Sequence, residues 1–382
     1  MPETRTSLRE LALLFSRLGL TAFGGPAAHV AMIHDEVVER RKWLTEQHFL
    51  DLLSAANLIP GPTSTELAIH IGWERRRFAG LVTAGLSFIV PAMAITAAFA
   101  WIYVKYGALP AVGALLYGVK PVVLAVVVHA LWGLLTKAVA STRLRLLAAV
   151  ATVAAAFGVN ELLLLLGAGL LSIATAHSAR GGKGSVSGLA PLASLSPAVL
   201  VSGVVQAINL PTLFWVFFKA GSLLFGSGYV LLAFLRADLV ERLGWLTEAQ
   251  LLDAIAVGQF TPGPVFTTAT FIGYVLLGPS GALVATAAIF LPAFVFVALS
   301  GPLVPRLRRS ATASAFLDGV NAASLAMMAV VTFQLGRAAL IDLPALFLAA
   351  ASALLLWRYR TNSAWLVLGG AALGFAWQTL RP

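Results

Sequence analysis

The chain is a series of apolar runs separated by short polar stretches. Two of the clearest runs extend from Phe78 to Val104 and from Gly281 to Val304. Each is longer than the roughly 20 residues that a helix needs to cross a bilayer core. Similar runs follow one another along nearly the whole sequence and leave no room for a soluble domain of useful size. The pattern predicts an all-α polytopic membrane protein.

The two parts of the sequence resemble each other when one is shifted along the other. "VERRKWLTE" at Val38 matches "VERLGWLTE" at Val240, and the PGP at Pro60 matches the PGP at Pro262, a shift of 202 positions. Beyond the PGP the shift becomes 201, as Gly72 and Gly273 show. We therefore expect a duplicated membrane unit, with an N-terminal repeat at 1–176, a linker at 177–210 and a C-terminal repeat at 211–382.

Basic clusters indicate how the two repeats are oriented. "ERRR" at Glu74 corresponds to the uncharged "VLLGPSG" at Val275, whereas "VPRLRRS" at Val304 corresponds to the nearly neutral "KYGALP" at Lys105. Lysine and arginine density sets the orientation of membrane segments. The alternation predicts two homologous halves with inverted topology, an arrangement common in secondary transporters.

An extra crossing is needed to invert the second repeat, and the apolar stretch from Pro191 to Leu210 could supply it. Full crossings throughout would give about 13 spans, with the N-terminus inside and the C-terminus outside. Re-entrant hairpins around Gly24 and Pro60 would instead keep the charges at 40–42 inside and lower that number. The sequence leaves both arrangements open.

Composition narrows the classes of function. Hydrophobic residues make up 59% of the chain and charged residues 11%, with a net charge of +10 and no cysteine. The basic residues lie in short clusters between apolar segments, which indicates membrane topology and a lipid bilayer as partner rather than nucleic acid. No metalloprotease, nucleophile-elbow, Walker or dinucleotide pattern stands in a matching context. We expect no enzyme activity, no cofactor and no metal site.

Glycine and proline interrupt the apolar runs at matching places in both halves. "FGGP" at Phe23 and "PGP" at Pro60 should each split a helix, because proline removes a backbone donor and clashes with the preceding turn. A half-helix that begins near Pro26 or Pro62 directs free N–H groups and a positive dipole end into the break. The hydroxyl groups at 63–65 add donors. The breaks predict an oxyanion site, although proline kinks that only shape packing are the alternative.

Several ionisable or polar residues lie at membrane depth, where they are costly and usually mark a pathway. Lys120 has no acid near it in the sequence and has Asn321 as its repeat mate, so it could attract an anion or lie at the interface. Glu66, whose mate is Thr268, could carry a coupling proton or cap its helix. His29, and more weakly His70, are candidates for the same coupling role.

Two further cations are repeat mates inside apolar segments, Arg17 in the first half and Lys219 in the second. They could mark a pathway or extend to the membrane interface. The matched Asp51 and Asp253 lie in the two "WLTE" segments, which we interpret as interface anchors with Thr45 as a helix start signal.

The set of motifs resembles the chromate ion transporter (CHR) family, long two-domain type. The resemblance rests on "AFGGPAAHVAM" at Ala22, "PGPTSTELAIHIG" at Pro60, "FGSGYV" at Phe225, "TPGPVFTTATFIGY" at Thr261 and "GVNAA" at Gly319, and it extends over nearly the full chain. Ser227 stands where the family pattern has us expect glycine.

The resemblance implies a secondary transporter that exports chromate across the bacterial cytoplasmic (inner) membrane as an antiporter driven by the proton motive force, conferring chromate resistance. Protons are then a coupling partner, and a second copy of the chain is a candidate homodimer partner. A sulfate carrier and a non-transporting membrane scaffold are the alternatives. The predicted substrate-binding residues are Gly24, Gly25, Pro26, Pro60, Gly61, Pro62, Thr63, Ser64, Thr65, Lys120, Gly226, Ser227, Gly228, Tyr229, Pro262, Gly263, Pro264 and Asn321, with Glu66 and His29 as coupling residues and Arg17 and Lys219 as secondary candidates.

Overall fold

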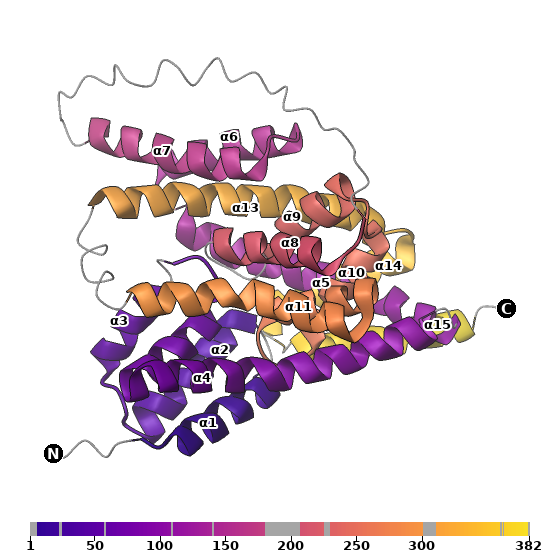
Figure 1. Cartoon of the computed structure of the whole chain (residues 1–382). Helices are drawn as coiled ribbons and strands as arrows, with labels where there is room; N and C mark the ends of the chain where they lie inside the picture. The colour runs from indigo at the N-terminus through magenta and orange to yellow at the C-terminus, as the bar shows by residue number, and fades with distance from the viewer. Residues whose placement is uncertain are drawn as a thin grey trace.

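The structure, a computed structural model, is helical wherever it describes regular elements (Figure 1). It describes residues 6–22, 25–56, 59–107, 110–139, 141–179, 207–224, 230–300, 311–359, 361 and 363–380. The predicted extra crossing in the linker, the FGSGY motif at 225–229 and the basic loop at 301–310 lie outside these residues. The predicted all-α fold is confirmed.

The two halves contain corresponding helices in the same order. The first half comprises α1 (Leu8–Thr21), α2 (Gly25–His34), the π-helix η1 (Asp35–Arg40), α3 (Glu46–Ala56), α4 (Thr63–Tyr106), α5 (Pro110–Ala138), α6 (Thr142–Ala156) and α7 (Glu161–Ala179). The second comprises α8 (Leu210–Leu223), α9 (Leu231–Leu235), η3 (Arg236–Arg242), α10 (Glu248–Phe260), the 3₁₀ turn η4 (Val265–Thr267), α11 (Thr268–Ser300), α13 (Ala311–Ala339), α14 (Leu343–Tyr359) and α15 (Ser363–Thr379). Even the π-helices recur at matching positions.

The glycine- and proline-containing motifs interrupt helices as predicted. α1 ends at Thr21 and α2 begins at Gly25, on either side of FGGP, while α3 and α4 flank the first PGP. Pro62 is the N-cap residue of α4, where a missing N–H costs nothing because the first amides of a helix have no partner inside it. In the second half, α10 ends at Phe260, just before Thr261 and the second PGP.

α4 turns back on itself at Arg76 and Arg77. Both have non-helical backbone angles, and Arg77 has φ +50° and ψ −137°. Gly72 and Gly80 face each other across this turn, because a Cβ atom on either would clash with the carbonyl oxygen of the other. α4 is therefore a helical hairpin, with a short arm at 63–75 and a long arm at 78–106.

α11 repeats the same hairpin at Leu277 and Gly278, where Gly278 has φ +64° and ψ −153°. The hydroxyl groups of Thr270 and Thr286 lie 2.7 Å apart across it. In a straight helix these residues would be separated by about 24 Å along the axis. The apolar pattern alone concealed both turns.

The first two hairpin-like segments of the chain start and finish at one end of the molecule. Arg75 and Arg76, at the turn of α4, donate to Thr6 just before α1, at 2.8 Å and 2.6 Å. Arg75 also lies 5.6 Å from the ring centre of Trp43, after η1. The His48 ring of α3 lies 3.8 Å from the Glu74 carboxylate. We call this region of the first half the basic end.

The chain therefore leaves the basic end in α1 and returns in α2 and η1, then leaves in α3 and returns in the short arm of α4. These contacts favour the re-entrant alternative over full crossings for both segments. Arg41, beyond η1, also donates to Glu10 of α1 at 2.8 Å, which ties the first return to its start. The start signal predicted at Thr45 is confirmed, since Thr45 accepts from the His48 amide, and at the matching position of the second half Thr247 forms a capping box with Gln250.

The two halves pack against each other reciprocally. α5 of the first half packs most extensively against α14 and α15 of the second, and α13 of the second half packs against α6 and α7 of the first. Gly118 in α5 lies against the α15 backbone at Gly370, and its repeat mate Gly319 in α13 lies against the α7 backbone at Ala168. Each half has the same role toward the other, as in a two-fold interface.

Among the described residues, four stretches are long and apolar enough to cross a membrane: Thr63–Tyr106, Ala111–Gly133, Val265–Leu299 and Ser314–Ala339. In the first and third, the hairpin turns leave the long arms of α4 and α11 as the membrane-length parts. Large apolar side chains on the outer helices are exposed, among them Phe347 at 76% and Trp365 at 71%. Such a surface suits lipid rather than water.

Candidate functional site

The breaks of the two halves meet through a reciprocal pair of hydrogen bonds. The N–H of Gly61, in the first PGP, donates to the carbonyl of Leu224 at the end of α8, at 2.7 Å. The N–H of Gly263, in the second PGP, donates to the carbonyl of Ala22 at the end of α1, at 2.9 Å. Both pairs are related by the same shift of 202 positions. Each PGP turn thus satisfies a helix end of the opposite half.

Only glycine fits at the centre of either PGP turn. Gly61 has φ +141° and Gly263 has φ +89°, backbone conformations that other residues rarely adopt. A Cβ atom at Gly61 would collide with the Glu66 carboxylate, and one at Gly263 would lie 2.5 Å from the Ala92 Cβ. The prolines on both sides fix the chain direction around these turns, which makes each break a rigid element.

Some hydrogen-bond donors in the first turn of α4 are already used within the first half. The amides of Thr65 and Glu66 donate to the Pro62 carbonyl at 2.8 Å and 3.0 Å. The Ser64 hydroxyl lies 3.3 Å from Nδ1 of His29, while the Thr65 hydroxyl is buried without a hydrogen-bond partner. The predicted cradle of free amides is therefore narrower than the sequence suggested.

His29 connects the two motifs of the first half. Its Nε2 lies 3.1 Å from the Ala22 carbonyl, the same oxygen that accepts from Gly263, and the residue as a whole is 1% exposed. Since a carbonyl only accepts, Nε2 carries the proton in this contact and Nδ1 faces the Ser64 hydroxyl. The predicted coupling residue His29 thus lies where FGGP, the first PGP and the second PGP come together.

Glu66 is fully buried, and neither carboxylate oxygen has a hydrogen-bond partner in the described structure. Its carboxylate lies against Gly61 of the PGP turn. Buried polar atoms in proteins are nearly always hydrogen-bonded, so an orphaned carboxyl group of this kind calls for an explanation. The structure therefore keeps Glu66 as a candidate for proton or ligand binding.

Lys120 was expected to lack a neutralising acid, and this prediction is wrong. Its ammonium group lies 3.0 Å from Oδ1 of Asp253, whose other oxygen accepts a 2.9 Å hydrogen bond from Tyr103. Lys120 belongs to α5, Asp253 to α10 and Tyr103 to the long arm of α4, so the cluster joins the two halves. Asp253, which we had interpreted as an interface anchor, is only 4% exposed. Asn321, the repeat mate of Lys120, is half-buried in α13.

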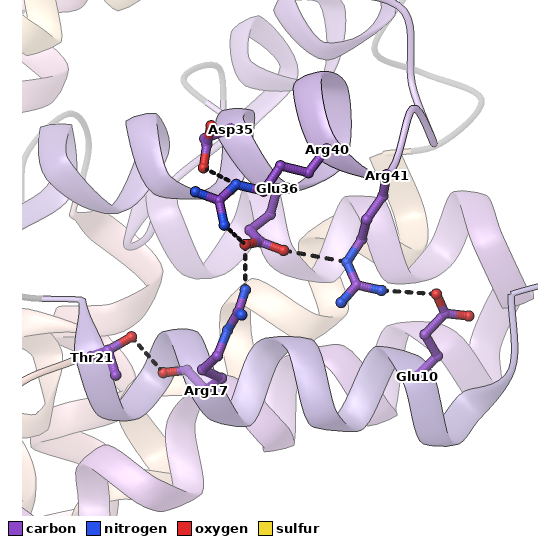
Figure 2. A network of polar contacts seen from close by, with 7 residues as sticks. All are labelled: Glu10, Arg17, Thr21, Asp35, Glu36, Arg40 and Arg41. Carbon is purple, nitrogen blue, oxygen red and sulfur yellow. Dashed lines mark hydrogen bonds and ion pairs between the residues drawn. The ribbon is translucent and has the colours of Figure 1, made fainter.

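Arg17 and Lys219 both pair with acids on the returning segment of their own hairpin. Arg17 forms an ion pair with Glu36, which also contacts Arg40 and Arg41, and Figure 2 shows this network between α1 and η1. Lys219 lies 2.5 Å from Asp238, the repeat mate of Glu36. The secondary candidates therefore hold hairpin segments together at places that are equivalent in the two halves.

Glu36 lies outside the four candidate spans and shows what these pairs do electrostatically. Its burial would raise the pKa, but hydrogen bonds and charges from Arg17 and Arg41 outweigh that effect and hold the pKa below its ordinary value of 4.5. Glu36 is therefore ionised and neutralises part of the basic surroundings at neutral pH.

The remaining predicted residues differ in how far they can be placed. Pro60, Pro62, Pro262 and Pro264 flank the two glycines as expected, and Gly25 and Pro26 form the start of α2. Gly24 and the predicted residues Gly226, Ser227, Gly228 and Tyr229 lie outside the described residues.

Sequence reasoning did not place three residues that the structure brings into this region. Ala92 and Ala293 follow matching prolines and contact the PGP glycine of the opposite half. Their small size and their pairing across the repeat were visible signals. Tyr103, the third, contacts a residue 150 positions away, which no local pattern indicates.

Helical hairpins, long apolar helices and two interlocked homologous halves define the chain as a polytopic membrane protein of the duplicated kind. The family model for "Chromate transporter" matches it twice, at residues 9–173 and 211–375. The chain belongs to the chromate transporter family. The resemblance inferred from the motifs is confirmed.

Curated relatives agree with this assignment. A chromate transport protein of Cupriavidus metallidurans is 34% identical over 96% of this chain and 92% of its own length. A probable chromate transport protein of Synechococcus elongatus is 33% identical over 92% and 90%, and a chromate transport protein of Pseudomonas aeruginosa 31% over 97% and 92%. No solved structure matches the chain.

Proposed function

We propose that this protein exports chromate from the bacterial cytoplasm across the cytoplasmic (inner) membrane, as an antiporter in which proton entry drives chromate exit. Chromate resistance follows from such export. The family and the chromate transport proteins among the relatives support the substrate. The observation that carries the site is the reciprocal pair of hydrogen bonds from Gly61 and Gly263, together with the contacts of His29 to Ser64 and to the Ala22 carbonyl, which link the two PGP turns to the end of α1.

The proposed anion site lies beside these turns, at the start of the short arm of α4. Its helix dipole points positive charge toward the break, and the hydroxyl groups at 63–65 surround that end. A tetrahedral dianion suits such a site because its four oxygens accept hydrogen bonds in several directions. Thr65, whose buried hydroxyl has no partner in the described structure, is a ready donor.

Opposite insertion of the two halves is part of the proposal, and the packing supports it. Tyr103, near the end of the long arm of α4, lies close to Leu246 just before α10, to Gln250 in its first turn and to Val275 at the end of the short arm of α11. The end of α4 farthest from the basic end thus lies beside the part of the second half that corresponds to the basic end. Halves inserted in the same direction would instead place the basic end beside its counterpart in the second half.

The positive-inside rule then orients the whole chain. The basic end would face the cytoplasm, as would Arg143 after α5 and Arg358 at the end of α14. Opposite insertion of the two halves is compatible with the single linker crossing predicted from the sequence, which lies outside the described residues. Glu66 would be reached alternately from the two sides, and its carboxyl group would bind the driving proton.

Chromate uptake into everted membrane vesicles tests the proposal. Uptake that depends on the protein and rises with an acidic vesicle interior is the expected result. Absence of protein-dependent uptake would refute chromate transport. Stronger competition by sulfate than by chromate would favour a sulfate carrier. A non-transporting scaffold, in which the breaks serve packing alone, predicts no protein-dependent flux in the wild type and a Pro62→Ala variant that changes only the amount of folded protein.

A further inference from the structure

Three titratable residues occupy one face of the short arm of α4. Glu66, His70 and Glu74 follow each other at intervals of four residues, so their side chains are neighbours on the helix surface, one turn or about 6 Å apart. The first is fully buried beside the PGP turn, and His70 is 4% exposed. The Glu74 side chain is 39% exposed at the basic end, where His48 lies 3.8 Å away. The series leads from the proposed site to solvent.

The two inner members have polar atoms without partners. Both carboxylate oxygens of Glu66 and Nε2 of His70 are buried without a hydrogen bond in the described structure. An uncompensated buried polar group costs stability, and a buried charge costs more. Groups with only a structural role would be expected to have partners, so the arrangement points to a ligand that comes and goes. A proton suits both groups.

Only the first half carries this series. With the 201 shift, the positions of His70 and Glu74 are Phe271 and Val275 in the short arm of α11. The position of Glu66 is Thr267 or Thr268, depending on where the shift changes, and neither is titratable. Packing of the two hairpins is otherwise alike, as the matched glycines at their turns show. The polar face is therefore not a requirement of the hairpin.

We propose that Glu66, His70 and Glu74 form a proton path from the transport site to the basic end of the molecule. This inference rests on the proposed proton-coupled function. A proton bound to the Glu66 carboxylate passes to one ring nitrogen of His70, and the other nitrogen releases a proton to Glu74 or His48 and then to water. Glu66 is left as a carboxylate, and His70 returns to its neutral form by turning over. With the basic end in the cytoplasm, the path is the exit for the driving proton.

Other titratable or charged groups on the elements packed against α4 are already engaged or lie off this face. His29 of α2 contacts Ser64 and the Ala22 carbonyl, and Arg17 of α1 is paired with Glu36. Glu10 of α1 is bound by Arg41. On α3, Glu46 is paired with His34 of α2 at 2.6 Å and Asp51 accepts from Gln47, while His48 is part of the proposed exit. His70 therefore provides the connection that the path requires.

The test uses the purified full-length protein in proteoliposomes, with chromate as the probe. Two reactions are measured: chromate uptake with its accompanying proton flux under a pH gradient, and chromate–chromate exchange without a gradient, which needs no net proton movement. His70→Gln removes the titratable group and retains polarity and similar size. His129→Gln is the matched control, because Nδ1 of His129 is also buried without a partner in the described structure but belongs to α5, which is not among the elements packed closely against α4.

The path predicts that His70→Gln lowers gradient-driven uptake and proton flux about tenfold or more while exchange continues at the wild-type rate. His129→Gln retains both, and His70→Glu restores part of the proton flux. Should His70→Gln fail to fold, the double variant His48→Gln with Glu74→Gln tests the exit and should slow proton flux without slowing exchange.

The outcomes separate this inference from the proposed function. Loss of coupled flux in Glu66→Gln with normal flux in His70→Gln would overturn the path and leave proton coupling in place. Normal coupled flux in Glu66→Gln would overturn both. Equal losses in the His70 and His129 variants would also overturn the path, because a general effect of buried histidines would then explain the result.

Discussion

The ion pair between Lys120 and Asp253 gives a quantitative test of how the two halves are joined. Lys120→Met removes the ammonium group and retains chain length, which leaves the Asp253 carboxylate buried in α10 without its cation. Breaking a buried pair by removing one partner typically costs about 3–5 kcal/mol. Here the cost should be lower, about 2–3 kcal/mol, because the Lys120 side chain is 21% exposed and Tyr103 still donates to the carboxylate.

Asp253→Asn provides the second arm of a double-mutant cycle, and the double variant provides the closing corner. We expect each single variant to be destabilised and the double variant to be far less destabilised than their sum, with a coupling energy of about 2 kcal/mol. Reversible unfolding of the purified protein in mixed micelles, followed by circular dichroism, measures all four corners. Additive effects, or a Lys120→Met variant as stable as the wild type, would refute the pairing. Such a result would return Lys120 to the role of a free ammonium group that binds the anion.

Three further substitutions probe the break and the hairpins. Gly61→Ala should destabilise the protein by about 2–4 kcal/mol, because φ is +141° and the methyl group meets the Glu66 carboxylate. Gly113→Ala, at an open helical position, is the control. Equal unfolding midpoints of the two variants would contradict the strained turn. Arg77→Gly should stabilise the purified protein by about 1 kcal/mol, since φ is +50° with ψ −137°, and a lower unfolding midpoint would show that the arginine is not strained. Glu36 has a lowered pKa, so its contribution is present above pH 4.5 and is lost as the pH falls through its folded-state pKa. Unfolding midpoints of the Glu36→Gln variant should therefore approach those of the wild type as the pH falls below 4.5, and a constant difference would exclude Glu36 as the source.

Local chemistry explains which parts of the fold could be predicted from the sequence. The breaks at FGGP and the two PGP motifs follow from the missing N–H of proline and the freedom of glycine, which act within a few residues. The long arms of α4 and α11 follow from apolar length. The turns between the short and long arms could not be predicted. Arg76 and Arg77 have the composition of a basic loop between two spans, and Leu277 and Gly278 lie within an apolar run.

The same distinction holds for the site. Gly61 and Gly263 were predicted because they stand in a repeated motif, but their hydrogen bonds to the opposite half depend on tertiary packing. Lys120 was predicted to have no acidic partner because Asp253 lies 133 positions further along the chain. A matched acid at Asp51 and Asp253 was a usable signal, since a charge kept at equivalent membrane positions calls for a partner.

The hydrogen bonds from each PGP turn to a helix end of the opposite half bear directly on how transport could be controlled. Because Gly61 caps the end of α8 and Gly263 caps the end of α1, neither PGP turn can move without releasing a carbonyl in the other half. A released carbonyl at this depth must find water or another donor, and the freed glycine N–H must find an acceptor such as the anion, so movement of one break is costly unless a ligand accompanies it. His29 contacts the same Ala22 carbonyl that Gly263 caps, and its hydrogen bond would remain when that cap opens. The first half therefore has a replacement donor at its own break and the titratable groups on its short arm, whereas the second half offers Leu231 at the position of His29. On this argument we expect the second PGP turn to leave the first half at lower cost than the first PGP turn leaves the second half, so that the duplicated scaffold would move unequally.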